Sequence, residues 1–458
     1  MTQLILWIVV CLTASAVLAS RLRFLIALSI ALHVLLPTIA ISVVVGNPTG
    51  VPGVHPGGWL ALIGVGVQFL LHLEESVSVA LRNKLLISAG LVMTVAAVLF
   101  TVDASGVGGL GLIVNQIVAP FALFVLIRIE LGRRAASGTF LARSVIVFGA
   151  VASAVALLVW LRLIPQPFDA ELRGYSWYGV EFVRSLGTLD HPLALSLLMT
   201  LCIALLPSVR SSVAQVSLGI AFLATIFLTE SRTGLLLGAI GLVVVMVRKG
   251  ATVGARLAAL GAMAGALLLY LNSTLASGLA EKLVDDTGSA NARTLAIQAI
   301  LGDWTAYAVV GAGSGISFDV ARSLGLRTSF ENPLLMYMVD FGLLATIIYF
   351  GAMAMTALRR GTRSTPGGQA AGILVFIAVQ TYSSVGSNTS AGALLWIAVG
   401  FAARDALRSD KTDEMVVSSP TPRRGATRRS IDQQRRSRQP PTAPTRLVTK
   451  SAWAGRAQ

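Results

Sequence analysis

Apolar stretches long enough to form membrane-spanning helices recur from the first residues of the chain to about residue 403. A helix needs about 20 apolar residues to cross the hydrocarbon core of a bilayer. Spanning strands would instead show alternating segments of about ten residues, and the sequence contains none. The pattern therefore predicts an all-α, polytopic helical membrane protein with about 12–13 transmembrane helices.

Short polar connections separate the predicted spans, and the last two spans are short enough that they could form one re-entrant pair. The first span has no charged segment before it and is followed by Arg21 and Arg23. We therefore expect a retained helix with its amino terminus outside rather than a cleaved signal peptide. The predicted spans lie near 3–20, 24–45, 58–73, 85–102, 109–127, 144–162, 191–207, 215–229, 233–248, 256–272, 334–357, 368–386 and 390–403.

Positive charges occupy alternate connections. The loops at 46–57, 103–108 and 387–389 carry no Lys or Arg, whereas the connections between them are basic. Because cytoplasmic loops carry an excess of Lys and Arg, this alternation predicts a multi-pass inner-membrane protein with its N-terminus outside and its C-terminus in the cytoplasm. The basic connections contain Arg21, Arg23, Arg82, Lys84, Arg128, Arg133, Arg134, Arg143, Arg210, Arg248, Lys249, Arg256, Arg359, Arg360 and Arg363.

The composition agrees with this location and restricts the chemistry. Of the 458 residues, 55% are hydrophobic and 12% are charged, whereas a soluble protein carries about a quarter charged residues. Cys11 and Cys202 both lie in apolar runs, which argues against a disulfide framework and a thiolate metal site. The four histidines are scattered without ligand spacing, so we expect no metal and no cofactor.

The net charge of +15 is concentrated at the end of the chain. From Glu414 onward, ten basic residues are opposed only by Glu414 and Asp432. Pro, Ser, Thr and Gln lie between these charges, which predicts a disordered basic cytoplasmic tail. We expect this tail to lie near anionic lipid rather than to bind nucleic acid, although a role in binding RNA or protein stays open.

Four regions follow from these patterns. Three predicted outer connections, at 163–190, 230–232 and 273–333, carry arginines although the charge rule favours Lys and Arg on the cytoplasmic side, so something other than topology should retain them. The connection at 273–333 is unusually long, which favours a lid or a binding loop, and its run at 294–301 has helical spacing. The regions are N-terminal transmembrane helices (1–163), a catalytic region (164–357) with outer loops at 164–190 and 273–333, C-terminal transmembrane helices (358–407) and the tail (408–458).

Motifs for nucleotide-driven transport are absent. The sequence has no Gly-x-x-x-x-Gly-Lys-Ser/Thr loop, which argues against ATP-driven transport. The stretch from Gly311 to Gly315 superficially resembles a nucleotide loop but has no strand–helix frame, so we expect a flexible turn. Few ionisable residues fall inside the predicted spans, which argues against a proton-coupled antiporter.

The remaining candidates for a chemical role are the arginines on the predicted outer face. Arg232 stands where one predicted span ends and the next begins, which holds its guanidinium near the lipid headgroups. A planar fork of donors at that level suits a pyrophosphate, because Arg pairs with two phosphate oxygens and keeps its charge. The alternative is an arginine that extends to the interface beside Glu230 without a chemical role.

Four short motifs follow one another between about 165 and 350. They are Arg184-Ser-Leu-Gly187-Thr-Leu-Asp-His191-Pro192; Ser231-Arg232-Thr233-Gly234-Leu235-Leu236; Arg293 with Asp303-Trp304 and Gly311-Ala-Gly313; and Glu331-Asn332-Pro-Leu-Leu with Asp340-Phe-Gly342. In this order they resemble the motifs of the O-antigen ligase and O-antigen polymerase superfamily of bacterial surface-glycan enzymes. Each motif is weak alone, whereas four in the same order are fairly specific.

One position departs from that family's pattern. Where ligases of the family carry a histidine thought to act on the acceptor hydroxyl, this chain has Glu331. A glutamate can also accept a proton from a hydroxyl, but Glu331 could equally balance Arg322 or Arg327 as a loop carboxylate. The change argues against a lipid A-type ligase and leaves a polymerase or another glycan ligase open.

The resemblance implies a membrane glycan ligase or polymerase, that is, a metal-independent glycosyltransferase-type enzyme. Such an enzyme transfers a polyprenyl-pyrophosphate-linked glycan to an acceptor hydroxyl on the outer face of the cytoplasmic membrane. Its partners would be the lipid-linked donor, a glycan or lipid acceptor, and membrane lipid. The candidate residues are Arg232, Arg293 and Glu331 for catalysis and Arg184, Trp304 and Asn332 for substrate binding.

Alternative interpretations stay open for single residues and for the whole chain. Trp304 could stack on a sugar or lie at the membrane interface, and His191 before Pro192 is more typical of a helix start than of a base. A flippase or transporter of lipid-linked glycans would line a central cavity with charges inside its spans, whereas here the arginines gather at one face. In a non-catalytic membrane scaffold the arginines would be replaceable.

Overall fold

The computed structural model of the chain contains helices and connecting turns, and no strand within the residues that it describes. Those residues belong to one structural unit, Met1–Ala406. The predicted span at 256–272 lies almost entirely outside the described residues, and so does the tail at 408–458. Described are 2–46, 53–174, 178, 184–247, 261, 287–302, 304–326, 329–359, 361, 363, 365–382 and 389–404, of which 247, 287–293 and 389 are described by backbone only.

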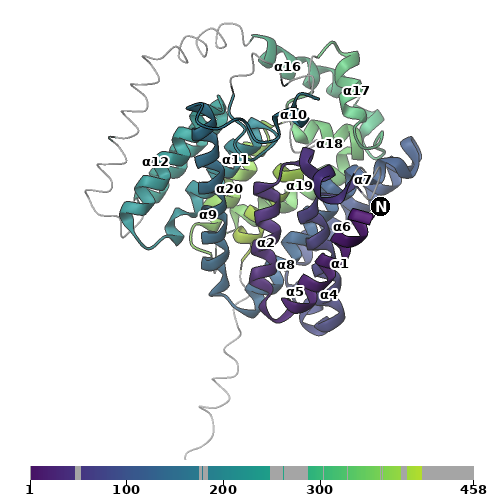
Figure 1. The fold of residues 1–458 in the computed structure, drawn as a ribbon. Coiled ribbons are helices and arrows are strands. Elements are labelled where there is room, and N and C mark those ends of the chain that lie inside the picture. Colours follow the sequence, from purple (N-terminus) through teal and green to yellow (C-terminus); the bar gives the residue numbers. More distant parts are fainter. Residues whose placement is uncertain are drawn as a thin grey trace, which may run out of the picture. The chain divides into compact units, whose positions relative to one another are not determined.

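Most of the helices lie side by side in a bundle, and a further group of helices lies at one end of it (Figure 1). The helices of the bundle are α1 (Thr2–Val17), α2 (Leu22–Leu35), α4 (Pro56–Leu71), α5 (Leu73–Arg82), α6 (Lys84–Ser105), α8 (Ala119–Arg133), α9 (Ser137–Trp160), α11 (Pro192–Leu205), α12 (Ser212–Leu228), α13 (Arg232–Val247), α19 (Leu343–Leu358), α20 (Gly368–Val379) and α21 (Thr389–Ala402). The others include α3 (Ile41–Val45), α7 (Leu110–Ile113), α10 (Asp169–Leu172), α16 (Thr287–Gly302), α17 (Ile316–Ser323) and α18 (Pro333–Phe341).

Two stretches of the described chain are long and apolar enough to cross a membrane, Lys84–Arg133 and Ser137–Trp160. Two bent pairs raise that number to four if each pair is one span. Thr2–Val17 meets Ala19–Leu35 at 70°, and Pro56–Leu71 meets Leu73–Arg82 at 114°. The remaining apolar helices are shorter, so the larger number of spans stays a prediction from the sequence.

The centre of the unit is built from helices that are apolar on every side. Residues 194–205 of α11 are all buried, because α9, α12, α13 and α20 surround this helix. α21 packs against α8 and α20 and buries Trp396, whose indole Nε1 donates to the Tyr349 hydroxyl at 2.9 Å. A helix that is hydrophobic all round has no face suited to water, so it takes the interior position.

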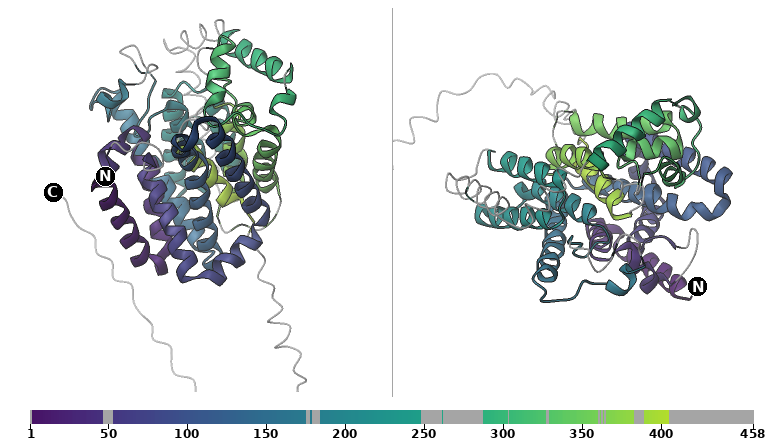
Figure 2. Two further views of the ribbon diagram at one scale, coloured as in Figure 1. Left: turned by 90° about the vertical axis from the view of Figure 1, so that its right-hand side faces the viewer. Right: turned by 90° about the horizontal axis from the view of Figure 1, so that it is seen from above.

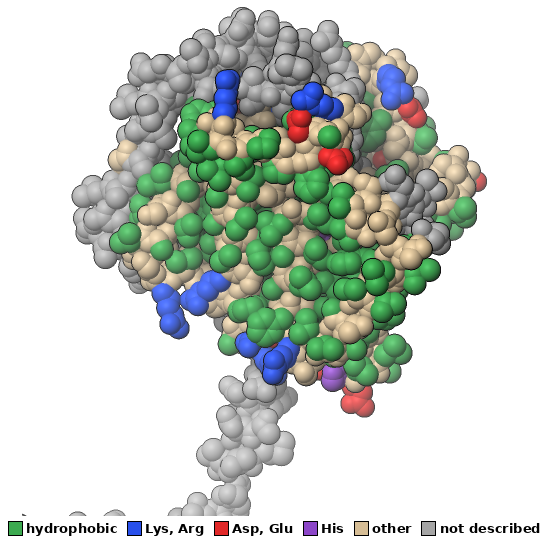
Figure 3. All heavy atoms as spheres, viewed as in Figure 1, with side chains coloured by type: hydrophobic (Ala, Val, Ile, Leu, Met, Phe, Trp, Pro, Cys, Tyr) green, Lys and Arg blue, Asp and Glu red, His purple; other side chains and the backbone are tan. Residues whose placement is uncertain are grey.

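Apolar side chains also cover much of the outside. Leu6 on α1, Leu99 on α6 and Val147 on α9 are more than half exposed, at 64%, 61% and 56%. Figure 3 shows hydrophobic side chains across the middle of one face, with Lys and Arg above and below this band. A contiguous apolar surface of this kind is rare on soluble monomers and typical of contact with lipid.

Two predicted spans have different bounds from those expected. The predicted span 24–45 ends at Leu35, because Pro37 follows and the chain turns before the short helix α3. The predicted span 334–357 is broken at Gly342 into α18 and α19. Gly342 has φ +83°, and a Cβ there would lie 2.5 Å from the Val309 carbonyl oxygen. The neighbouring backbone therefore fits against this position only if the residue is glycine.

The glycine-rich stretch from Gly311 to Gly315 is held in place by α6 and α18. The Ala312 and Gly313 amides donate to the carbonyls of Val339 and Asp340 at 2.8 and 2.9 Å. The Ser314 amide donates to the Thr101 hydroxyl at 2.9 Å. The turn expected here is confirmed at 314–315, and the hydrogen bonds make this stretch a junction between the residues that follow α16 and the long helices.

The carboxylate of Asp340 completes the junction from inside α18. It accepts hydrogen bonds from the amides of Gly315 and Ser317, at 3.2 and 2.7 Å, and from the Ser317 hydroxyl at 3.1 Å. These amides lie at the start of α17, where N–H groups lack partners within the helix. Asp340 therefore joins α17 to α18, and both lie with α16 at one end of the long helices, drawn in green in Figure 2. The helical spacing expected at 294–301 is confirmed, since this run lies within α16.

Replacing Gly311 by Ala tests this junction. The added Cβ would lie 2.3 Å from the Asp340 carbonyl oxygen and 2.5 Å from the Phe341 Cα. Because both contacts are backbone atoms, the junction has to shift, and we expect the free energy of unfolding to fall by about 1–3 kcal/mol. Thermal unfolding of the purified protein in detergent measures the loss. Gly302→Ala on α16 is the matched control, because no atom lies within 4 Å of its Cβ; equal melting temperatures for the two variants would contradict the prediction.

Candidate functional site

Residues from four separate segments meet beside the start of α11 and α13. We call them the Arg184 cluster: Arg184, Glu230, Ser231, Arg232, Glu331 and Tyr382. Arg184 precedes α11, the three residues 230–232 form the turn from α12 into α13, Glu331 precedes α18, and Tyr382 follows α20. The cluster therefore lies where helices begin and end, and its members come from chain positions that no local pattern connects.

The loop that carries Arg184 is buried from residue 185 to residue 190. The Ser185 amide donates to the Leu228 carbonyl at 2.9 Å, and the Thr188 hydroxyl donates to the Val34 carbonyl at 2.7 Å. Asp190 accepts from the Thr38 amide at 3.0 Å through its Oδ2. A buried loop is stable only when its polar groups find partners, and here the ends of α12 and α2 supply them.

Two local features set the path of this loop. Gly187 has φ +60°, and a Cβ there would lie 2.8 Å from the Ala152 carbonyl oxygen of α9. His191 is the N-cap of α11, and its Nδ1 accepts from the Leu193 amide at 3.2 Å. The sequence-based interpretation of His191 as a helix-start residue is therefore confirmed.

The turn between α12 and α13 is sharp and contains a buried serine. Glu230 has φ +53°, and its amide donates to the Phe227 carbonyl at 3.0 Å. Ser231 is 4% exposed, and its hydroxyl accepts from the Gly234 amide at 3.1 Å, which caps α13. A Cβ on Gly234 would lie 1.9 Å from the Ser196 hydroxyl oxygen, so α11 and α13 approach closely only because this residue is glycine.

The guanidinium of Arg184 connects the loop to this turn. Its Nε donates to the Thr229 carbonyl at 2.9 Å, which leaves the terminal amino groups for other acceptors. Burial lowers the pKa of Arg184, while the charges of Glu230 and Glu331 oppose that change. Arginine titrates far above neutral pH, so the group keeps its charge in this partly buried position.

Tyr382 is the member of the cluster that the sequence did not indicate. Its hydroxyl lies 3.1 Å from the Ser231 hydroxyl and 3.3 Å from the Ser196 hydroxyl, and the residue is 1% exposed. It therefore joins the end of α20 to the starts of α11 and α13. A tyrosine near the end of an apolar run is also what an ordinary interfacial residue looks like, so no sequence signal distinguished it.

Both carboxylate residues of the cluster have left-handed backbone. Glu331 has φ +49° and Glu230 has φ +53°, and among the described residues only Arg162 and Phe168 are further non-glycine residues with positive φ. Such a conformation costs on the order of 1–3 kcal/mol and persists only where the surroundings hold it. Residues with such backbone conformations are enriched at functional sites, which supports the interpretation of the cluster as a functional site.

The remaining predicted site residues lie in different settings. Asn332 caps α18, because its Oδ1 accepts from the Leu334 and Leu335 amides at 2.9 and 3.3 Å. Trp304 is 48% exposed in the short helix that follows α16, and the described contacts do not place it in the cluster. Arg293 lies on α16, and its side chain is outside the described residues.

The arginines of the segments that precede α11, α13 and α18 divide into two groups by their partners. Arg173 pairs with Asp169 at 2.8 Å, and Arg322 pairs with Asp319 at 3.0 Å. Both pairs are exposed and local in sequence, and such pairs contribute little to stability. Arg184 instead lies among the carboxylates of distant segments, and Arg232 begins the helix beside it. The structure therefore separates Arg184 from arginines that have an ordinary surface partner.

The cluster combines two guanidinium groups, two carboxylates and hydroxyl groups. These groups can bind an oxyanion and accept a proton from a hydroxyl. Comparison with protein-family models, with curated proteins and with solved structures finds no significant match to this chain. The chemistry of the site is therefore argued from its own side chains.

Tyr382→Phe tests whether the hydroxyl bridge holds the cluster together. The change removes a hydroxyl that contacts two buried serines, and we expect the free energy of unfolding to fall by about 1–3 kcal/mol. Chemical or thermal unfolding in detergent measures the difference from wild type. Tyr307→Phe, at a partly exposed tyrosine of the short helix that follows α16, is the control and should stay within about 0.5 kcal/mol of wild type. A Tyr382 variant as stable as this control would show that the bridge is unimportant.

Proposed function

We propose that this chain is a multi-pass inner-membrane glycan ligase or polymerase. It transfers a polyprenyl-pyrophosphate-linked glycan to an acceptor hydroxyl on the outer face of the cytoplasmic membrane. The observation that carries this proposal is the meeting of Arg184, Arg232 and Glu331 in one partly buried cluster. Positive groups for a leaving pyrophosphate and a carboxylate for a proton thus lie together.

The proposed reaction divides between these groups. The acceptor hydroxyl oxygen forms a bond to the anomeric carbon of the donor sugar, and the bond from that carbon to the pyrophosphate oxygen breaks. The hydroxyl proton passes to Glu331. Negative charge develops on the departing pyrophosphate and is stabilised by Arg232 and by Arg184, which the Thr229 carbonyl holds in place before the reaction. The spent carrier leaves sideways into lipid, and Arg293 on α16 is a third candidate cation.

Supporting observations come from the placement of charge and apolar surface. The Arg184 cluster lies at the N-terminal ends of α11 and α13, whereas Arg210 lies beyond the C-terminal end of α11. The exposed apolar band between the two ends of the helices suits lipid contact (Figure 3). A site at one end of the helices agrees with transfer at a membrane face and differs from the central charged cavity expected of a flippase.

Gene deletion followed by size profiling of surface and lipid-linked glycans tests the proposal. Single repeat units that accumulate on the carrier would indicate a polymerase, and full-length lipid-linked chains that never reach their acceptor would indicate a ligase. Complementation with Arg232→Lys should restore little of the missing product, because Lys keeps the charge but loses the planar fork.

Arg322→Lys is the matched control for that experiment. It makes the same change at an exposed outer arginine with a local partner, Asp319, and should complement fully. Intermediates trapped on the cytoplasmic side would favour a flippase instead. An unchanged glycan profile in the deletion strain, or full complementation by Arg232→Lys, would refute the proposal.

Glu331→Gln separates catalysis from binding. If Glu331 accepts the acceptor proton, the amide should lower turnover by roughly a hundredfold while donor binding stays near the wild-type value. Turnover of purified protein with a lipid-linked donor, and donor binding measured without acceptor, give the two quantities.

Glu230→Gln is the comparison variant, because it removes the other carboxylate that acts on Arg184. It should leave turnover much less affected than Glu331→Gln does. Equal losses of binding and turnover in the Glu331 variant would identify a structural carboxylate, and a larger loss of turnover in the Glu230 variant would move the base to Glu230.

A further inference from the structure

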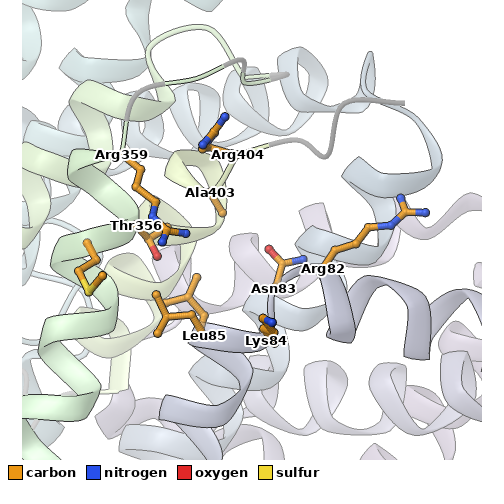
Figure 4. A pocket seen from close by; sticks show the side chains of 10 residues that line it. Arg82, Asn83, Lys84, Leu85, Thr356, Arg359, Ala403 and Arg404 are labelled. Atoms are coloured by element: carbon orange, nitrogen blue, oxygen red, sulfur yellow. The ribbon is translucent and has the colours of Figure 1, made fainter. Parts of the chain in front are cut away.

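A cavity of about 310 Å³ lies at the other end of the long helices, away from the Arg184 cluster. α5, α19 and α21 end at it, and α6 begins at it. Four basic residues line it: Arg82, Lys84, Arg359 and Arg404. Figure 4 shows Arg359 on one side of the opening and Asn83 on the other, while Arg82 extends outward. Within the part of the chain that the structure describes, no acidic residue lines the cavity.

The charges of these four residues are not neutralised locally. Among the described residues, none of the four lies within 4 Å of a carboxylate, unlike Arg133, Arg173 and Arg322, which pair with Glu75, Asp169 and Asp319. Arg128 lies directly behind the lining. It donates to the Asn83 Oδ1 at 3.2 Å and to the Arg404 carbonyl at 2.8 Å. The cavity is therefore strongly electropositive.

The side chain of Asn83 leaves the start of α6 uncapped. Asn is among the residues that usually cap a helix by accepting from its first amides. Here the Asn83 Oδ1 accepts from Arg128, and its Nδ2 donates to the Val79 carbonyl at 2.8 Å, so no side-chain cap is made. The first turn of α6, from Lys84 to Leu86, lines the cavity. Its amides add donors and positive potential to those of the basic side chains.

Helix ends of the opposite sign do not cancel this charge. Each helix C-terminus carries roughly half a negative elementary charge, and α5, α19 and α21 together contribute roughly one and a half. The start of α6 returns roughly half a positive charge. Four full positive charges on the lining exceed this sum, so the balance in the cavity stays positive. If the basic residues served only to offset the negative helix ends, the net charge of the cavity would be close to zero.

We propose that this cavity binds a phosphate group, as a phosphomonoester or phosphodiester. A phosphate offers several oxygens to the converging guanidinium, ammonium and amide donors, and Arg pairs with it through two parallel hydrogen bonds. The volume accommodates a headgroup-sized anion. Anionic lipid at this end of the helices and a free phosphate compound share this chemistry. The proposal stands independently of glycan transfer, since it uses no residue of the Arg184 cluster.

The test compares two double variants that remove equal charge. Arg359→Gln with Arg404→Gln changes the cavity, whereas Arg21→Gln with Arg210→Gln changes exposed arginines in the other basic connections. Full-length protein is purified in detergent and mixed with phosphatidylglycerol or phosphatidylcholine, and retained lipid is measured by native mass spectrometry. We expect the cavity variant to bind phosphatidylglycerol roughly tenfold more weakly than wild type, and the control variant to bind like wild type.

The response to inorganic phosphate distinguishes a soluble phosphate compound from a lipid headgroup as the source of the bound phosphate group. If it raises the melting temperature of wild type in phosphatidylcholine but not that of the cavity variant, while phosphatidylglycerol is not retained, the ligand is a soluble phosphate. If the cavity variant does not fold, the comparison is repeated at exposed side chains. Lys84→Gln then serves as the cavity variant and Arg210→Gln as the control. Equal phosphatidylglycerol binding and equal phosphate response in the cavity and control variants would overturn the proposal.

Discussion

Where the chain leaves a helix inside this apolar unit, its backbone N–H and C=O groups must find other hydrogen-bond partners. The arrangement of the chain depends on how these groups are paired. The loop at 184–191 illustrates the constraint, because the ends of α2 and α12 accept and donate the bonds that the loop needs. The stretch from Gly311 to Gly315 meets it through Asp340 and Thr101. In both places the pairing that satisfies the backbone also fixes side chains that carry charge.

This coupling explains how a candidate site can form at helix ends. Arg184 donates to the Thr229 carbonyl, Ser231 caps α13, and the Tyr382 hydroxyl contacts Ser231. Each bond stabilises a helix end or a turn, and together they hold one guanidinium beside two carboxylates whose backbone is left-handed. A site built from such bonds is rigid before any ligand arrives, and that rigidity is what stabilisation of a developing negative charge requires.

The two ends of the helices differ in chemistry. At one end, cations lie among carboxylates and hydroxyls, which suits a reaction on an anionic substrate. At the other end, a cavity is lined by Arg82, Lys84, Arg359 and Arg404 and, among the described residues, by no carboxylate, which suits binding of an anion without a proton acceptor. The same residue type therefore has different roles at the two ends, and the neighbouring groups decide which role it has.

The sequence by itself determined the all-helical class, the positions of most long helices and the helix at 294–301, because apolar run length and helical spacing are local properties. It also placed Arg184, Arg232 and Glu331 in segments outside the predicted spans. The break at Gly342, the junction at Gly311 and the place of Tyr382 depended on contacts between distant segments, so only the tertiary structure decided them. The tertiary structure also decided that Asn332 caps α18 and that Asn83 does not cap α6. A side-chain amide makes whichever hydrogen bonds its folded neighbours offer.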